Sequence, residues 1–164
     1  MTIKARFGIK LPDIPAVDPT RVDAITRDEI LPAVESATLL LERAVTVKTP
    51  VGATGMARGS IQSAVNAKRG LVTSYRGRVM SAAPYIVPLE EGSRPHWAPI
   101  APLKRWARIK LGDERIAYAV QRVIARRGTK GKHMFRDATL EEGARIERML
   151  RQGVERWRRR LGGK

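Results

Sequence analysis

The sequence predicts an α+β fold: a long N-terminal helix, a small antiparallel sheet of three to four strands, and three C-terminal helices. Three patterns predict this class. Apolar residues recur at helical spacing from residue 20 to residue 45. Short segments of alternating polarity follow between residues 60 and 82, and helical spacing returns from residue 103 onward.

The chain of 164 residues has the size of one domain, which we expect at residues 20–161. Residues 1–19 contain three prolines with weak periodicity, which indicates an extended arm, either mobile or lying on a neighbouring subunit. Residues 162–164 indicate a flexible tail. The stretch Trp157–Lys164 is predicted to fray or to bind a partner rather than to fold by itself.

The first helix is predicted to begin at Thr20, which can cap it. Pro32 is expected to kink this helix or to begin a second one. The sequence Lys48-Thr49-Pro50 ends the helical pattern. Two neighbouring rows of apolar residues make a wide face that predicts packing on a sheet or on other helices. These rows are Leu31, Val34, Thr38, Leu41 and Val45, and Ile30, Ala33, Ala37, Leu40 and Ala44.

A glycine-containing loop, residues 51–60, leads from the helix toward the strands. It lacks the Lys-Ser/Thr pair that follows the last glycine of a phosphate-binding loop, which favours a simple turn. Three short strands are predicted next, with basic turns between them, at Ser60–Asn66, Leu71–Tyr75 and Arg78–Ala82.

The segment Ala83–Ile100 connects the strands to the C-terminal helices. It holds four of the chain's ten prolines, which predicts neither an ordinary helix nor an ordinary strand. Its apolar residues are too numerous for a solvated linker. We therefore predict a rigid, largely packed crossing between the two halves of the chain.

Three helices are predicted after this crossing. The first covers residues 103–111 and ends at a glycine. The second begins after Asp113, which can cap it, and ends before Gly128. A basic loop follows, and the last helix is predicted to begin at Asp137 or Thr139.

The formal net charge is +16, and half of this excess lies between Lys104 and Lys132, where there are ten basic residues and two acidic ones. Such an excess attracts polyanions, so we expect contact with DNA or with an acidic protein surface. No base-reading motif is present, so contact with DNA would be made through phosphates. The candidate residues for this contact are Lys104, Arg105, Arg108, Arg126, Arg127, Lys130 and Lys132.

The sequence offers no constellation typical of an active site. It has no cysteine, and its two histidines, His96 and His133, have no matching carboxylate cluster, which predicts no metal site. Glu90 and Glu91 are adjacent and would point apart in an extended segment. We therefore predict no enzyme, no cofactor and no metal. No apolar run has the length of a membrane span or of a signal peptide, which predicts a soluble protein with no membrane partner.

Three segments, taken in order, resemble a family of small phage proteins. TPVGATGMARGSI (49–61) is similar to the family's Thr-Pro entry with its Thr-Gly-x-Leu-Arg-x-Ser-Ile motif. APYIVPLEEGSRPHWAPI (83–100) resembles its Tyr-x-x-x-x-Glu-x-Gly-Thr signature, and RGTKGKHMFRDA (127–138) its closing Arg-Gly-Thr-Lys segment. Over residues 20–145 the chain thus resembles the tail-completion or head–tail joining (neck) proteins of long-tailed bacteriophages.

The chain departs from the family's pattern in three places, and these departures affect local packing more than the resemblance itself. Ala57 stands where Leu is usual, and Ser93 where Thr is usual. His133-Met134 stands where Pro usually precedes Phe135.

The resemblance implies a structural virion protein of the phage neck, made in the bacterial host cytoplasm. Such a protein would form a homo-oligomeric ring around the DNA channel, with six copies from the symmetry usual in phage tails. It would dock an adjacent neck or connector protein and the tail terminator or tail tube protein. Nonspecific contact with packaged double-stranded DNA is also expected. Two alternatives stay open: a tail terminator ring that caps the tail tube and, from another class, a nonspecific basic DNA-binding protein.

Seven residues are candidates for contacting an interface or determining the fold: Arg58, Glu90, Gly92, Arg94, His96, Trp97 and Phe135. Glu90 is predicted to pair with Arg58 or Arg94. Gly92 fits a turn that requires positive φ. Trp97 and Phe135 are expected to fill the core rather than to anchor a partner.

Overall fold

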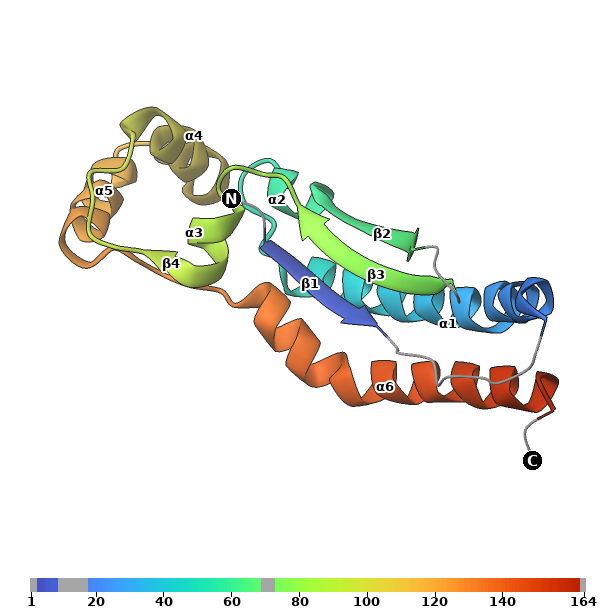
Figure 1. The fold of residues 1–164 in the computed structure, drawn as a ribbon. Coiled ribbons are helices and arrows are strands. Elements are labelled where there is room, and N and C mark those ends of the chain that lie inside the picture. Colours follow the sequence, from blue (N-terminus) through green and yellow to red (C-terminus); the bar gives the residue numbers. More distant parts are fainter. Residues whose placement is uncertain (1–2, 9–17, 69–72, 163–164) are drawn as a thin grey trace.

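The structure is a computed structural model, described at residues 3–8, 18–68 and 73–162. The predicted α+β class is confirmed. Two long helices, α1 (Pro19–Lys48) and α6 (Met134–Arg160), pack against each other and run in opposite directions (Figure 1). A small sheet packs on α1, and a pair of shorter helices, α4 (Ile100–Leu111) and α5 (Ile116–Arg127), stands at one end.

Helix α1 is a single helix of 30 residues. Asp18 caps it, because its Oδ1 atom accepts the backbone N–H of Thr20 at 3.0 Å, and Pro19 takes the first position, where no N–H donor is needed. The cap predicted at Thr20 is therefore wrong. A second helix beginning at Pro32 is also wrong, since this proline lies inside α1. The predicted end of the helix at Lys48 is confirmed.

The sheet has three antiparallel strands, in the order β1 (Ile3–Gly8), β3 (Ser74–Ser81) and β2 (Ile61–Lys68). Strand β1 comes from the segment that the sequence indicates as an extended arm. Within the same chain it pairs with residues 76–81 of β3. The rest of that segment, residues 9–17, lies outside the described residues.

Strand β3 runs through the boundary between the second and third predicted strands; residues 71–72 of the second lie outside the described residues. The turn predicted at Arg76-Gly77 is wrong, because both residues lie within β3. Gly77 is buried and faces Val65 of β2 in the register. A glycine inside a strand commonly marks close packing rather than a turn, and here it lies on the face toward α1.

The predicted crossing contains regular structure. The prediction that it would form no ordinary helix or strand is therefore wrong. It forms helix α3 (Ile86–Glu91) and a two-residue strand, β4 (Gly92–Ser93), which pairs with β5 (Thr129–Lys130). The one proline within α3, Pro88, is tolerated because it is the third residue of the helix. Backbone N–H groups in the first turn have no intrahelical partner, so a missing donor costs little there.

Helix α6 begins at Met134, three residues before Asp137, so the predicted start of the last helix is wrong. The helix continues through Arg160. The fraying predicted from Trp157 onward is therefore wrong for residues 157–160. Trp157 is 1% exposed, and its Nε1–H donates to Thr26 Oγ1 at 2.8 Å. This buried contact fixes the end of α6 on the beginning of α1.

One hydrophobic core joins α1, β2, β3, α3 and α6, and it includes Val34, Leu41, Val79, Ile86 and Phe135. The prediction that Phe135 is a core residue is confirmed. No residue from 92 to 133 belongs to this core. The α4–α5 pair is therefore stabilised separately from the rest of the chain. Among the described residues, no helix is long and apolar enough to cross a membrane.

Candidate interaction surface

The first motif of the resemblance shapes the end of α1. Arg58 lies on a short helix, α2 (Met56–Gly59), and its guanidinium donates to backbone carbonyls of the last turn of α1. Its Nε and Nη2 atoms donate to the Thr49 oxygen at 3.2 and 3.0 Å, and Nη2 also donates to the Val47 oxygen at 3.4 Å. Because these carbonyls lack an intrahelical partner, Arg58 acts as a C-terminal cap.

Glu90 performs the corresponding role at the start of α6. Its side chain is buried, and its two carboxylate oxygens accept the backbone N–H groups of Phe135 and Arg136, both at 3.1 Å. A carboxylate at a helix N-terminus satisfies free donors and interacts favourably with the helix dipole. The pairing predicted for Glu90 with Arg58 or Arg94 is therefore wrong.

Two loops that the sequence treats separately meet beside Glu90. Gly92 has a φ of +85°, which confirms the predicted positive φ. A Cβ atom there would collide with the backbone of Thr129 and Gly131. The backbone N–H of Lys132 donates to the Leu89 oxygen at 2.8 Å. The second and third motifs of the resemblance therefore form one closely packed junction, from which the chain leaves toward α4 and returns from α5.

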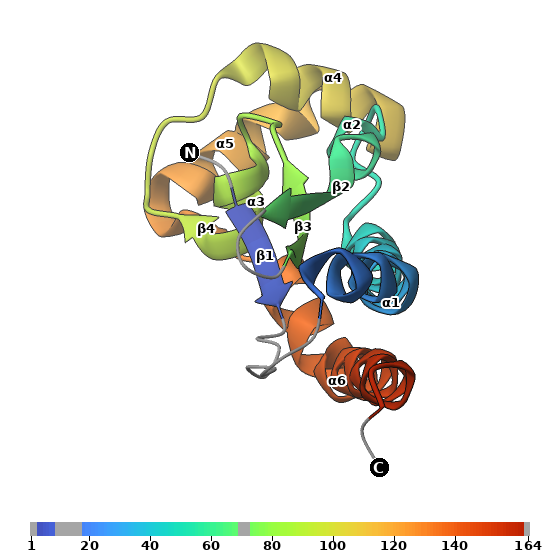
Figure 2. The ribbon, with the colours of Figure 1, turned by 45° about the vertical axis from the view of Figure 1, so that its right-hand side comes forward.

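Residues 94–127, which we call the helical lobe, project beyond this junction. In Figures 1 and 2 the lobe stands at the end of the molecule where α3 and β4 lie. Its buried residues are three alanines, Ala98, Ala107 and Ala117. Gln121 Nε2 donates to the Ala98 oxygen at 2.7 Å and ties α5 to the segment before α4. Alanines bury little apolar area, so the interior of the lobe is small.

The lobe exposes several large apolar side chains, and others, among them Leu103, Trp106 and Val120, are half-buried. Trp97 is 70% exposed, so the prediction that it fills the core is wrong. The exposed large apolar residues of the lobe are Trp97, Ile109, Leu111, Ile116, Tyr118 and Val123. Large apolar patches on a protein surface mark interaction sites. The sequence does not reveal this surface, because the helical spacing of apolar residues predicts an apolar face without showing whether another element covers it.

The seven predicted cationic candidates lie on the lobe and on the segment that follows it. Lys104, Arg105 and Arg108 are on α4, Arg126 and Arg127 end α5, Lys130 is in β5, and Lys132 precedes α6. Within the described part of the chain, none of the seven takes part in an ion pair.

Lys104 links the two helices of the lobe. Its Nζ atom lies 5.0 Å from the centre of the Tyr118 ring, within range of a cation–π interaction. A side-chain hydrogen bond with Tyr118 also raises the pKa of Lys104 above its usual value.

Arg94 and His96 lie on the segment between β4 and α4, and both side chains are exposed. The Nδ1 atom of His96 is 2.9 Å from the Arg94 backbone oxygen, and the His96 backbone N–H donates to the Ile124 oxygen at 3.4 Å. The structure therefore places Arg94, His96 and Trp97 at the base of the lobe. Arg58 lies apart from them, at the end of α1.

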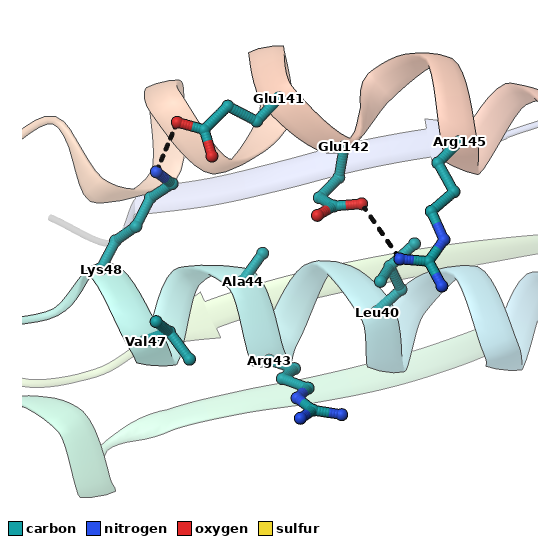
Figure 3. A pocket seen from close by; sticks show the side chains of 8 residues that line it. All are labelled: Leu40, Arg43, Ala44, Val47, Lys48, Glu141, Glu142 and Arg145. Carbon is teal, nitrogen blue, oxygen red and sulfur yellow. Dashed lines mark hydrogen bonds and ion pairs between the residues drawn. The ribbon is translucent and has the colours of Figure 1, made fainter.

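A groove of about 440 Å³ runs between α1 and α6 (Figure 3). Four of its five charged side chains form two ion pairs, and Arg43 is the fifth. Lys48 Nζ is 2.6 Å from Glu141 Oε1, and Arg145 Nη1 is 3.9 Å from Glu142 Oε2. Because its acidic groups are neutralised by cations of the same chain, the groove does not gather convergent free polar groups as a substrate site does.

The described residues contain no group of three or more His, Cys, Asp or Glu side chains that could hold a metal ion. Glu90, the buried carboxylate, is occupied as a helix cap. Comparisons with protein-family models, with curated proteins and with solved structures found no match to this chain. The surface that stands out is therefore the helical lobe, with its exposed apolar residues and cations without acidic partners.

Proposed function

We propose that this chain is a structural protein of a bacteriophage neck, a tail-completion or head–tail joining protein without catalytic activity or cofactor. In this proposal six copies form a ring around the DNA channel and dock the neighbouring neck and tail rings in the virion. The observation that carries the proposal is the helical lobe, which lies outside the core and presents an apolar and cationic surface.

The three motifs that resemble the neck family support the proposal through their positions. Arg58 caps α1, Glu90 caps α6, and Gly92 permits the close approach of β4 to residues 129–131. These residues fix how the lobe leaves the rest of the described chain, residues 3–8, 18–68, 73–93 and 128–162, which we call the body. A subunit that joins two rings needs a projecting surface in a defined orientation, and a surface held in advance loses less entropy on binding.

The composition of the lobe fits contact with a protein. Protein interfaces combine apolar anchors, in which aromatic residues and Arg are enriched, with a polar rim. Trp97, Ile109 and Val123 provide exposed apolar area, and the surrounding cations favour a partner with an acidic surface. We therefore assign the lobe to the neighbouring ring or to the adjacent subunit.

The test is to image the head–tail junction of particles that carry a tagged copy of this chain. The proposal predicts tag density in a symmetric ring at the neck, which also gives the copy number. A ring located at the tail side alone would favour the tail terminator alternative. Absence of the chain from mature particles, together with its binding to DNA in the cell, would overturn the proposal in favour of a nonspecific DNA-binding protein.

A further inference from the structure

The three-stranded sheet has two different faces. One face packs on α1, and there the residues Ile61, Val79 and Ser81 are buried. Successive side chains of a strand point to opposite faces, so residues of the other parity form the opposite face. Its described Lys and Arg residues, which we call the cationic sheet face, are Lys4, Lys68, Arg76 and Arg78.

No acidic residue balances these charges within the sheet. None of the three strands contains an Asp or a Glu. None of the four cations takes part in an ion pair with another described residue. In addition, the Nε atom of Arg78 is buried and has no hydrogen-bond partner among the described residues. Gathering like charges costs free energy, and a bound anion would offset this cost.

The strand register sets the spacing of the charges. Arg76 and Arg78 are two residues apart on β3, which corresponds to about 7 Å along the strand. Arg76 pairs with Asn66, and Lys68 follows Asn66 by two positions on the neighbouring strand. Lys4 lies on the strand at the opposite edge of the sheet. The charges are therefore spread across all three strands, as contact with an extended polyanion requires.

The character of this face distinguishes it from the helical lobe. None of the large apolar side chains of β2 and β3 is exposed. The one large apolar residue of these two strands on the cationic sheet face, Met80, is half-buried. Its neutral members Gln62, Asn66 and Ser74 are exposed hydrogen-bonding groups. Phosphate contacts use Lys, Arg and such neutral donors, whereas the centre of a protein interface needs apolar anchors.

We infer that the cationic sheet face contacts the phosphates of double-stranded DNA, without reading its bases. The inference deepens the proposed neck function and rests on it, because it assigns the DNA channel to the sheet and leaves the lobe to protein neighbours. The cationic sheet face offers the charged and hydrogen-bonding groups that contact phosphates, whereas the lobe offers the exposed apolar residues that contact proteins.

The experiment compares two triple variants of the purified chain that lose the same number of charges. One carries Lys4→Gln, Lys68→Gln and Arg76→Gln on the sheet, and its control carries Arg105→Gln, Arg108→Gln and Arg126→Gln on the lobe. All six side chains are exposed, and far-UV circular dichroism with thermal unfolding checks that both variants fold. Fluorescence anisotropy then measures affinity for a labelled random-sequence DNA duplex over a range of NaCl concentrations.

Each lost phosphate contact lowers the slope of log affinity against log salt by about 0.9, so the sheet variant should lose about 2.7 in slope and about tenfold or more in affinity. The lobe variant should lose less than about one unit of slope. Equal losses in the two variants, a larger loss in the lobe variant, or no binding by the unmodified chain would overturn the inference.

A competition arm separates DNA from an acidic protein. Polyglutamate should displace the duplex from the unmodified chain only weakly. If polyglutamate competes as well as DNA and loses affinity equally in the sheet variant, the face fits an acidic protein and the DNA assignment is wrong. Imaging of particles is independent of these results. A ring at the neck without the slope effect rejects only the sheet assignment, whereas the slope effect without a ring rejects only the neck function.

Discussion

Helix α6 and the helical lobe contain similar numbers of basic residues and use them differently. Helix α6 has eight basic and five acidic residues, whereas the lobe has nine basic and two acidic residues. Six of the eight α6 arginines form ion pairs, among them Arg156 and Arg160 with Glu29 of α1. No basic residue of the lobe does so within the described chain. The basic residues of this chain thus fall into two groups. Those of α6 mostly form ion pairs within the body, and those of the lobe are available to a partner.

The two regions also differ in what they bury. The α1–α6 pair encloses Trp157, Leu41 and Val34, whereas the lobe encloses three alanines and exposes Trp97. Large buried side chains supply most of the free energy of folding. The stability of this chain therefore resides in the body, whereas the lobe presents a surface.

The largest expected effect on the free energy of unfolding comes from replacing one tryptophan in each of the two regions by alanine. Trp157→Ala should lower the free energy of unfolding by about 3–5 kcal/mol, because it leaves a cavity and removes the partner of Thr26. Trp97→Ala should change it by no more than about 0.5 kcal/mol, since this side chain is 70% exposed. Urea unfolding followed by circular dichroism measures both. Similar losses for the two tryptophans would contradict the division into body and lobe.

The next effect concerns the junction between the two regions. Glu90→Ala should cost about 2–4 kcal/mol, because the backbone N–H groups of Phe135 and Arg136 would lose their buried acceptor and the helix its charged cap. The adjacent Glu91 is exposed, and Glu91→Ala is the matched control with an expected change within about 0.5 kcal/mol. The same denaturation experiment applies, and an equal cost for the two variants would show that Glu90 is not a cap.

The smallest effect concerns the ion pairs of the body. The hydrogen bond from Arg160 lowers the pKa of Glu29 below its usual value of 4.5. Because the folded-state pKa is the lower one, the stabilisation is complete above about pH 4.5 and is lost as the pH falls through the folded-state pKa. Glu29→Gln should therefore cost at most about 1 kcal/mol at neutral pH, and the difference from the unmodified chain should shrink in acid.

The control for this prediction is Glu147→Gln, which removes an exposed pair with Arg151 inside α6. Urea unfolding of both variants at neutral pH and below pH 4.5 gives the comparison. If the two variants respond equally to pH, the contact between α1 and α6 adds nothing beyond a surface ion pair.

The parts of the fold that the sequence predicts are those with long periodic patterns. The two apolar rows of α1 contain Val34, Ala37, Leu41 and Val45, and all four are buried as expected. Thirty residues of consistent spacing leave little ambiguity. The sequence predicts a break within β3 because Gly77 resembles a turn residue locally, and only its pairing with a neighbouring strand shows that it belongs inside the sheet.

The candidate surface was harder to predict because its features depend on distant partners. Glu90 and the backbone that it caps are 45 residues apart, and no local pattern announces such a contact. Trp97 and Trp157 are equally apolar, but only Trp157 meets a helix that can cover it. The stretch Trp157–Lys164 is predicted to fray or to bind a partner, but Trp157 is buried, and Arg156 and Arg160 pair with acidic residues of α1.

The assignment of docking to the lobe is tested most directly by measuring whether a lobe variant is incorporated into particles made by the genome that encodes this chain. The variant carries Ile109→Asp and Val123→Asp, and its control carries Leu39→Asp and Val47→Asp, which are also exposed apolar residues but lie on α1. We predict that both proteins unfold at the denaturant concentration of the unmodified chain, and that only the control appears at the neck. Incorporation of the lobe variant at the unmodified level would contradict the assignment of docking to the lobe.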